Sequence, residues 1–222
     1  MDGIILVMPN LDKAFILYYL LAETKSSPLN QSAMKIIFCA LAMVLGMPLF
    51  AQQPSQEEAM KAMNAYRTPG EMHKMMASWD GTWECEYSMW MEPGKEPFKS
   101  KGTMTSKMLL DGRYNEMHYN GDFMGEPMKG VSMSAWDNAK KAFITTWIDN
   151  FGTGVMWLEG PWDAATKTIQ LYGKMTDPVS GGDTKVRQFV TMIDDNTQKM
   201  QMWVDYGGTE MKTMEMIMKK KK

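Results

Sequence analysis

Residues 81–91 read GTWECEYSMWM, and this stretch decides the fold. Large or apolar side chains stand at alternate positions from Trp83 to Met91, with mostly polar side chains between them. A period of two is typical of a β-strand that buries one face. Before Gly81 the apolar period is that of a helix, so the chain changes from helix to strand at this point.

The strand pattern recurs to the end of the chain. Further strand-like runs lie at 99–110, 113–121, 127–136, 141–149, 153–161, 166–175, 184–193, 198–206 and 209–219. Asp, Asn and Gly gather between the runs, which favours tight turns. About ten short strands with links of hairpin length predict a mainly β fold, a single up-and-down antiparallel barrel. Closure into a barrel also leaves no exposed sheet edge.

Two helical segments precede the strands. Residues 55–66 carry apolar side chains at helical spacing, and so do residues 72–79. Thr68, Pro69 and Glu71 have the spacing of an N-cap, a first helical residue and a capping-box partner. The sequence therefore predicts short N-terminal helices, the second of them starting at Thr68.

The N-terminal residues have the pattern of an export signal. Met34-Lys35 is followed by an apolar run over 36–50 and then by Ala51, the order of a secretory signal peptide. We predict a signal peptide at 34–51, cleaved after Ala51, and a periplasmic or secreted protein. The run is too short for a membrane span of roughly 20 residues, so no stable span is expected after cleavage. We interpret residues 1–33 as an upstream extension without a structural role.

The remaining chain divides into an N-terminal helix or linker at 52–67 and a barrel domain at 68–222. A lipoprotein with Cys39 as the modified residue is a disfavoured alternative, because large residues precede that cysteine. The oligomeric state stays open.

Composition excludes several classes of protein. The net charge of -2 provides no basic surface for nucleic acid. Two Cys cannot form a disulfide framework or a four-cysteine zinc site. The sequence contains no nucleophile elbow, phosphate-binding loop or zinc-protease motif. We therefore predict no catalytic residue and no metal site, and favour a protein that is not an enzyme.

Isolated reactive side chains have simple interpretations. His118 and Glu116 share a strand face and form either an acid–base couple or, as we favour, an exposed pair. His73 is expected at a helix surface or helix–barrel contact rather than as a haem ligand. Cys85 shares a face with Trp83 and Tyr87, which indicates a buried, unreactive thiol.

Methionine is unusually frequent, at 27 of 222 residues. Thioethers can bind Cu(I), and the strand positions of Met214, Met216 and Met218 place three on one face. They can also serve as reversible oxidant sinks. Methionine is spread over nearly every predicted strand and both helices, however. We therefore favour flexible core packing over a metal site.

Several short motifs resemble the bacterial domain of unknown function family 1579, from about Thr68 to Lys219. They are Pro69 to Lys74, Trp79-Asp80-Gly81-Thr82-Trp83, Asp111-Gly112-Arg113-Tyr114, Gly121 to Pro127, Trp136-Asp137-Asn138, Thr146-Trp147-Ile148-Asp149, Tyr172-Gly173, Asp177-Pro178 and Met214-Glu215. The resemblance implies a calycin-type barrel, related in architecture to lipocalins and fatty-acid-binding proteins, but no activity.

Gly81 and Trp83 also resemble the lipocalin Gly-x-Trp signature. In that signature the Trp closes the barrel base beneath an Arg from the last strand. The resemblance gives this position to Lys219, which keeps the charge but weakens the cap. Our candidate ligand-binding residues are Arg113, Trp147, Asp149, Trp157 and Arg187. Trp147 and Asp149 are the leading pair, and Trp157 and Arg187 rank after them.

The leading functional hypothesis is an exported barrel that binds a small hydrophobic or amphipathic molecule without catalysis. The first alternative is a haem-binding barrel with redox or isomerase-type activity, by analogy with haem barrels of this architecture. The second is a methionine-rich copper-binding or oxidant-buffering envelope protein. A purely structural or partner-binding domain is the third.

Overall fold

The structure is a computed structural model that describes residues 54–222. The predicted signal peptide at 34–51 and the extension at 1–33 lie outside the described residues. Within them, Ser55 to Lys222 form one compact unit. It consists of two helices followed by eleven strands, which confirms the mainly β prediction.

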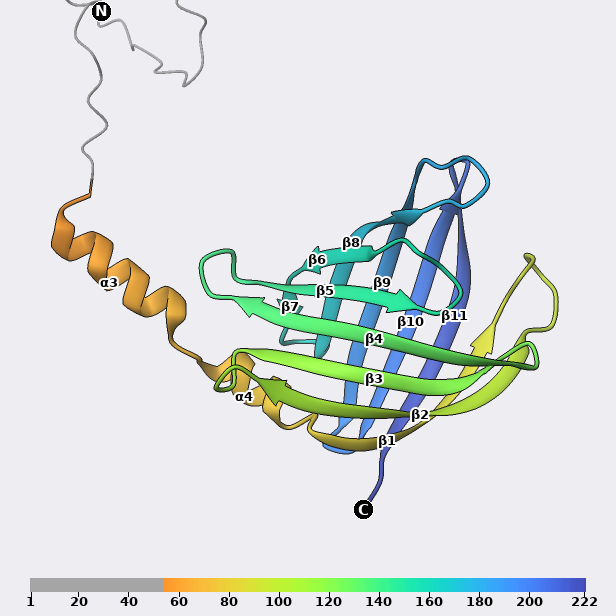
Figure 1. Cartoon of the computed structure of the whole chain (residues 1–222), viewed down its shortest axis with the longest axis horizontal. Coiled ribbons are helices and arrows are strands. Elements are labelled where there is room, and N and C mark those ends of the chain that lie inside the picture. Colours follow the sequence, from red (N-terminus) through yellow and green to blue (C-terminus); the bar gives the residue numbers. More distant parts are fainter. Residues whose placement is uncertain (1–53) are drawn as a thin grey trace, which may run out of the picture. The chain divides into compact units, whose positions relative to one another are not determined.

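The elements follow one another with short connections (Figure 1). The helices are α3 (Gln56–Arg67) and α4 (Glu71–Ala77). The strands are β1 (Gly81–Met89), β2 (Phe98–Leu109), β3 (Tyr114–Phe123), β4 (Glu126–Asp137), β5 (Ala142–Asp149), β6 (Met156–Gly160), β7 (Trp162–Asp163), β8 (Thr168–Thr176), β9 (Asp183–Asp194), β10 (Thr197–Tyr206) and β11 (Thr209–Lys220).

All strands join one antiparallel sheet in the order β6-β5-β4-β3-β2-β1-β11-β10-β9-β8-β7, and an additional pairing of β6 with β8 closes it. Ten strands thus form the barrel predicted from the sequence, and the two-residue strand β7 is an unpredicted addition. In Figure 1, β1 to β5 run across β8 to β11, so the barrel has two walls whose strands cross.

The closing seam depends on two glycines. A Cβ at Gly160 would lie 1.8 Å from the carbonyl oxygen of Gln170, and one at Gly173 would lie 1.9 Å from that of Trp157. No side chain fits at such distances from backbone atoms. Because a strand glycine lets another backbone approach closely, this pair allows β6 and β8 to meet.

Side chains alternate between the interior and the outer surface. On β1, Trp83, Cys85 and Tyr87 are buried, while the intervening Glu84 and Glu86 are exposed. The expectation of a buried thiol at Cys85 is confirmed, and burial raises its pKa to about 12, which keeps it in the unreactive form.

One end of the barrel, which we call the helix end, is closed by α4 and the residues after it. Trp83 is 1% exposed, and its Nε1–H donates to the carbonyl oxygen of Trp79 at 2.8 Å. Lys220 covers this tryptophan, with Nζ 5.8 Å from the ring centroid and a hydrogen bond to the Ser78 carbonyl oxygen. The expected cation at Lys219 is therefore wrong by one residue. Lys220, not Lys219, pairs with Trp83 across the strands.

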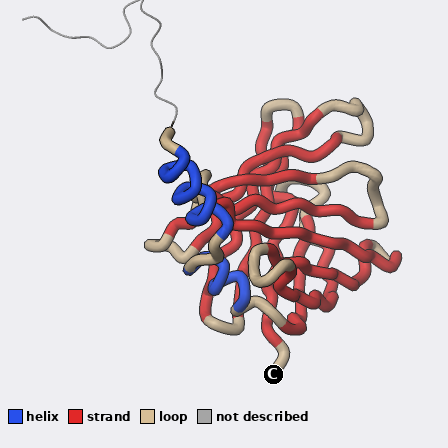
Figure 2. The backbone as a smooth tube through the Cα atoms, turned by 60° about the vertical axis from the view of Figure 1, so that its left-hand side comes forward, coloured by secondary structure: helices blue, strands red, loops and turns tan. Residues whose placement is uncertain are grey.

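Figure 2 shows the two helices one after the other beside the barrel. They differ in how they contact it. None of the residues of α3 is buried, although it starts with a complete capping box between Ser55 and Glu58. The amide of Asn138, in the β4–β5 turn, donates to the carbonyl oxygens of Ala65, Tyr66 and Thr68. These bonds hold the C-terminal end of α3 at the barrel.

The predicted cap of the second helix is wrong. The helix α4 begins at Glu71 with Gly70 as its N-cap, and the hydroxyl of Thr68 instead donates to the carbonyl oxygen of Asn64 in α3. At α4, the backbone N–H of Gly70 donates to Nδ1 of His73 at 3.0 Å. His73 is thus the capping-box partner, the role that the sequence pattern predicted for Glu71.

His73 makes stability depend on pH. Burial, and secondarily the nearby Arg113, lower the pKa of His73 in the folded protein. The unfolded chain therefore binds this proton first as the pH falls below the ordinary histidine value of about 6.5. We expect the free energy of unfolding to decrease from pH 7 to pH 5, and His73→Gln to remove part of that decrease. Urea titrations of both proteins across this range measure it; identical pH slopes would contradict it.

Neither helix in residues 54–222 is long and apolar enough to cross a membrane.

Candidate functional site

The barrel encloses a cavity of about 710 Å³. It extends from Trp79 and Phe143 near the helix end to residues of the loops 150–155 and 177–182 at the opposite end, which we call the mouth. Ligand pockets in proteins commonly measure roughly 300–1,000 Å³ and are mostly apolar. The size and position of the cavity make it the candidate site.

Methionine forms much of the cavity lining. The eleven methionines that line it are Met89, Met104, Met117, Met128, Met156, Met175, Met200, Met202, Met214, Met216 and Met218. On β10 and β11, Met200 pairs with Met216 and Met202 with Met214, so their thioethers lie in adjacent rows. We call Met89, Met200, Met202, Met214, Met216 and Met218 the methionine wall. Unbranched thioether side chains adapt to irregular shapes, so this wall is deformable.

Three aromatic residues on β1, β3 and β5 form a second part of the lining, which we call the aromatic wall. Tyr87, Tyr119 and Trp147 lie side by side. The ring centroids are 6.4 Å apart between Tyr87 and Tyr119, and 6.3 Å apart between Tyr119 and Trp147. Two of the rings pack against glycines: a Cβ at Gly121 would be 2.2 Å from the Tyr119 hydroxyl, and one at Gly130 would be 2.2 Å from the Trp147 ring. Glycine at these strand positions therefore leaves room for the rings and keeps the cavity open.

Few polar groups face the interior. Ser134, Thr145, Gln188 and Gln198 line the cavity, and the Ser134 and Thr145 hydroxyls bond to each other at 3.2 Å. The Tyr119 hydroxyl has no hydrogen-bond partner among the described residues, and burial raises the pKa of this phenol. An unpaired buried hydroxyl costs roughly 1–3 kcal/mol. The interior thus offers scattered hydrogen-bonding groups in an apolar container.

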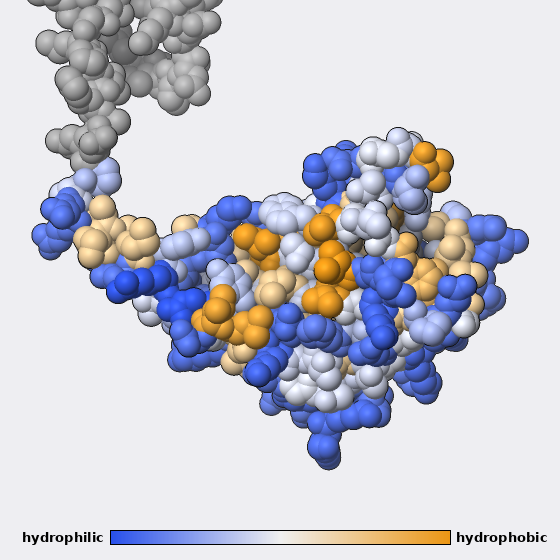
Figure 3. All heavy atoms as spheres, in the orientation of Figure 1, coloured by the Kyte–Doolittle hydropathy of each residue, from blue (hydrophilic) through white to orange (hydrophobic). Residues whose placement is uncertain are grey.

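The outer surface is different in character. On the side drawn in Figure 3, most of the surface is hydrophilic, and apolar atoms appear in small separate groups. At the mouth, Phe151 and Val155 line the cavity and are also 45% and 56% exposed. An apolar ligand would therefore meet apolar side chains at the entrance as well as inside.

Trp147 and Asp149, the leading predicted pair, lie together in the cavity lining. The Nε1–H of Trp147 donates to Oδ2 of Asp149 at 2.7 Å, and the backbone N–H of Phe151 donates to Oδ1 at 2.9 Å. These bonds hold the carboxylate at the end of β5, next to the mouth.

The other three predicted residues lie elsewhere. Trp157 is 41% exposed and lies on the outer surface, since its neighbours Met156 and Leu158 face inward. Arg187 is also outside, where its guanidinium lies 4.0 Å from the Trp203 ring centroid and pairs with Glu210.

Arg113 lies at the helix end, in the turn between β2 and β3. Its guanidinium donates to the carbonyl oxygen of Leu110 at 3.1 Å. None of Arg113, Trp157 and Arg187 lines the cavity. The structure therefore brings together only two of the five candidates.

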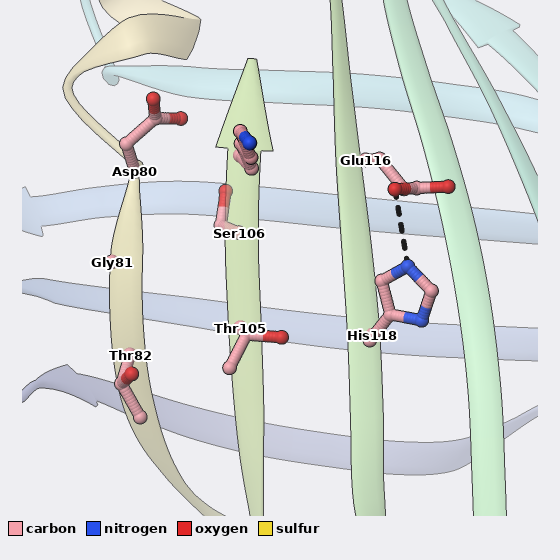
Figure 4. A pocket seen from close by; sticks show the side chains of 8 residues that line it. Asp80, Gly81, Thr82, Thr105, Ser106, Glu116 and His118 are labelled. Carbon is pink, nitrogen blue, oxygen red and sulfur yellow. Dashed lines mark ion pairs between the residues drawn. The ribbon is translucent and has the colours of Figure 1, made fainter. Parts of the chain in front are cut away.

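Glu116 and His118 lie on the outer face, in a shallow polar hollow that also includes Asp80 and Thr105 (Figure 4). His118 Nε2 is 3.1 Å from a Glu116 carboxylate oxygen, and their side chains are 51% and 31% exposed. This is the exposed pair favoured from the sequence. In residues 54–222, no group of three or more His, Cys, Asp or Glu side chains is placed to hold a metal ion.

Fold and site together define a closed antiparallel β-barrel with a largely apolar internal cavity. The chain belongs to the family described as "Protein of unknown function (DUF1579)", whose sequence profile matches residues 68–220. The resemblance seen in the sequence is thus confirmed. A comparison with curated proteins found no match.

Two solved structures were compared with the barrel. The crystal structure of Rv2717c from M. tuberculosis matches with a TM-score of 0.55 and 8% identity, covering 70% of this chain and 100% of that one. The crystal structure of the ywiB protein from Bacillus subtilis matches at a TM-score of 0.29 and 10% identity, covering 64% and 91%. At these identities the first match supports the barrel architecture alone, and the second is too weak to support any inference.

Sequence reasoning missed most of the cavity lining. Tyr119 and Gln188 were not selected, although alternation gives a signal: Gln188 shares a strand face with Val186 and Val190. The neighbouring Arg187 was chosen because it is cationic, but it belongs to the opposite face.

Proposed function

We propose that this protein binds a small hydrophobic or amphipathic molecule inside its barrel, without catalysis. The observation that carries the proposal is the cavity of about 710 Å³ between the methionine wall and the aromatic wall. Closing such a space around an apolar molecule removes apolar surface from water, which is worth roughly 25 cal/mol for each Å².

The composition of the walls supports an adaptable binding site. Methionine side chains change rotamer at low cost and recur at binding surfaces that accept varied partners. Tyr87, Tyr119 and Trp147 add rigid faces against which a flat or chain-like molecule can stack. The methionine excess is then explained by a deformable lining.

The haem and copper alternatives have weaker support. Neither His73 nor His118 lines the cavity, so a haem inside the barrel would have no histidine ligand. The methionine wall offers thioethers for Cu(I), but its members extend along three strands from Met89 to Met218.

Export is the second part of the proposal. It rests on the signal pattern at 34–51, which lies outside the described residues. The protein isolated from its native cell is then expected to have the mass of a chain that starts at Gln52. A mass that includes residues before Met34 would contradict cleavage at this site.

Titration with the neutral fluorescent probe N-phenyl-1-naphthylamine tests the ligand-binding proposal. We expect saturable binding of one probe per barrel, with strong fluorescence enhancement. Met200→Trp, which adds bulk inside the cavity, should weaken binding by more than about tenfold. Met133→Trp is the matched control, because Met133 lies on the opposite face of β4 from Ser132 and Ser134. Absent binding, or equal binding by all three proteins, would overturn the proposal.

A further inference from the structure

The charge inside the cavity is negative. Among the side chains that line it, Asp149 carries a carboxylate, and no Lys, Arg or His of residues 54–222 lines the same space. None of the ion pairs found in those residues involves Asp149. A partly buried carboxylate without a cationic partner is available to a ligand that carries one.

Hydrogen bonds fix this carboxylate without using all its accepting capacity. Oδ2 accepts from the Trp147 indole at 2.7 Å, and Oδ1 accepts from the Phe151 backbone at 2.9 Å. A carboxylate has about four lone-pair sites, so each oxygen can accept one further hydrogen bond. The Asp149 carboxylate is therefore held in position and can still accept hydrogen bonds from a ligand.

Aromatic side chains lie near Asp149 at the mouth of the cavity. Phe123 and Phe151 contact each other edge to face, with centroids 5.0 Å apart, and both line the cavity near the mouth. Trp147 presents its N–H edge, not its ring face, to the carboxylate, so the phenylalanine rings are the candidates for contact with a cation. Aromatic faces attract ammonium groups, by roughly 0.5–2 kcal/mol depending on desolvation.

We propose that the barrel prefers amphipathic cations: molecules with an apolar body in the methionine-lined interior and an amine or quaternary ammonium group beside Asp149. This inference rests on the proposed function, since it requires that the cavity binds apolar molecules. Fatty-acid anions are disfavoured, because their carboxylate would lose water next to a like charge.

Three ligands that share a twelve-carbon chain separate the effect of head-group charge from that of chain length. Dodecyltrimethylammonium, dodecanol and dodecanoate are compared by displacement of N-phenyl-1-naphthylamine, the two ions below their micelle concentrations and the alcohol below its solubility limit. We expect the cation to bind at least about tenfold more tightly than the anion, with the alcohol between them. Asp149→Asn should reduce the cation-to-anion ratio to near one, and its circular dichroism spectrum and urea midpoint show whether the barrel is intact.

Glu126→Gln is the matched control, because Glu126 is an exposed carboxylate at the mouth end of β4, outside the cavity. It should leave the cation-to-anion ratio unchanged. Displacement by all three ligands with dodecanoate equal to or tighter than the cation would overturn this inference and leave the proposed function standing. An unchanged ratio in Asp149→Asn would overturn the role of Asp149. No displacement by any ligand would overturn both proposals.

Discussion

Replacing Gly173 by alanine is expected to prevent the barrel from closing and to lower the free energy of unfolding by at least about 3 kcal/mol. Gly173 lies on β8, opposite Leu158 of β6 at the closing seam. An added Cβ would be 1.9 Å from the carbonyl oxygen of Trp157 and 2.9 Å from the Cα of Leu158. These are backbone atoms, so no change of rotamer relieves the clash, and the two strands must separate.

Urea unfolding followed by circular dichroism measures this effect. Gly152→Ala is the control, since Gly152 lies in the β5–β6 loop and a Cβ there would meet nothing within 4 Å. We expect the control to unfold at the wild-type urea concentration. A Gly173→Ala protein with the wild-type midpoint would show that the seam is not packed as described.

Replacing Trp83 by alanine is expected to cost about 3–5 kcal/mol of stability. Trp83 is 1% exposed at the helix end, donates to the Trp79 carbonyl oxygen and lies beneath the Lys220 ammonium. The substitution removes a large buried ring and leaves a cavity together with an unpaired carbonyl group. Trp83→Phe should cost less, because it keeps most of the packing and loses the hydrogen bond.

Thermal and urea unfolding of the two variants measure the difference. Trp157→Ala serves as the comparison, because Trp157 is 41% exposed on the outer surface. We expect its cost to be about 1 kcal/mol or less. If the alanine variants at 83 and 157 proved equally stable, Trp83 would not close the helix end of the barrel.

Much of the fold could be predicted from the sequence. The period-two alternation first seen in residues 81–91 and the turn residues between the runs indicate the ten barrel strands and their order along the chain, but not the two-residue strand β7. Closure was inferred from the regular hairpin links. The pairing of β6 with β8 at the closing seam was not predicted. The need for glycine at 160 and 173 becomes evident only when the two strand backbones lie side by side.

The candidate site was predictable only in part. Trp147 and Asp149 were identified because they share one face of one strand, and the structure places both in the cavity. On β6 and β9, large side chains stand on both faces, so alternation alone does not indicate which face is internal. Trp157 and Arg187 were chosen for their chemistry, and both lie outside.

His73 illustrates a similar limit. The Thr68-Pro69-Gly70-Glu71 pattern satisfies the rules for a capped helix, yet Gly70 is the N-cap and His73 is its partner. Burial of His73 against the barrel determines this arrangement, and burial of that kind is a tertiary effect. Conversely, Ser55 and Glu58 form a capping box that the same rules identify.

A crystal structure of the protein grown with dodecyltrimethylammonium tests the central claim most directly. The account predicts electron density for the alkyl chain inside the barrel, between the methionine wall and the Tyr87–Tyr119–Trp147 wall, with the ammonium group beside Asp149. An interior filled by collapsed methionine side chains, with any ligand density confined to the outer surface, would contradict it.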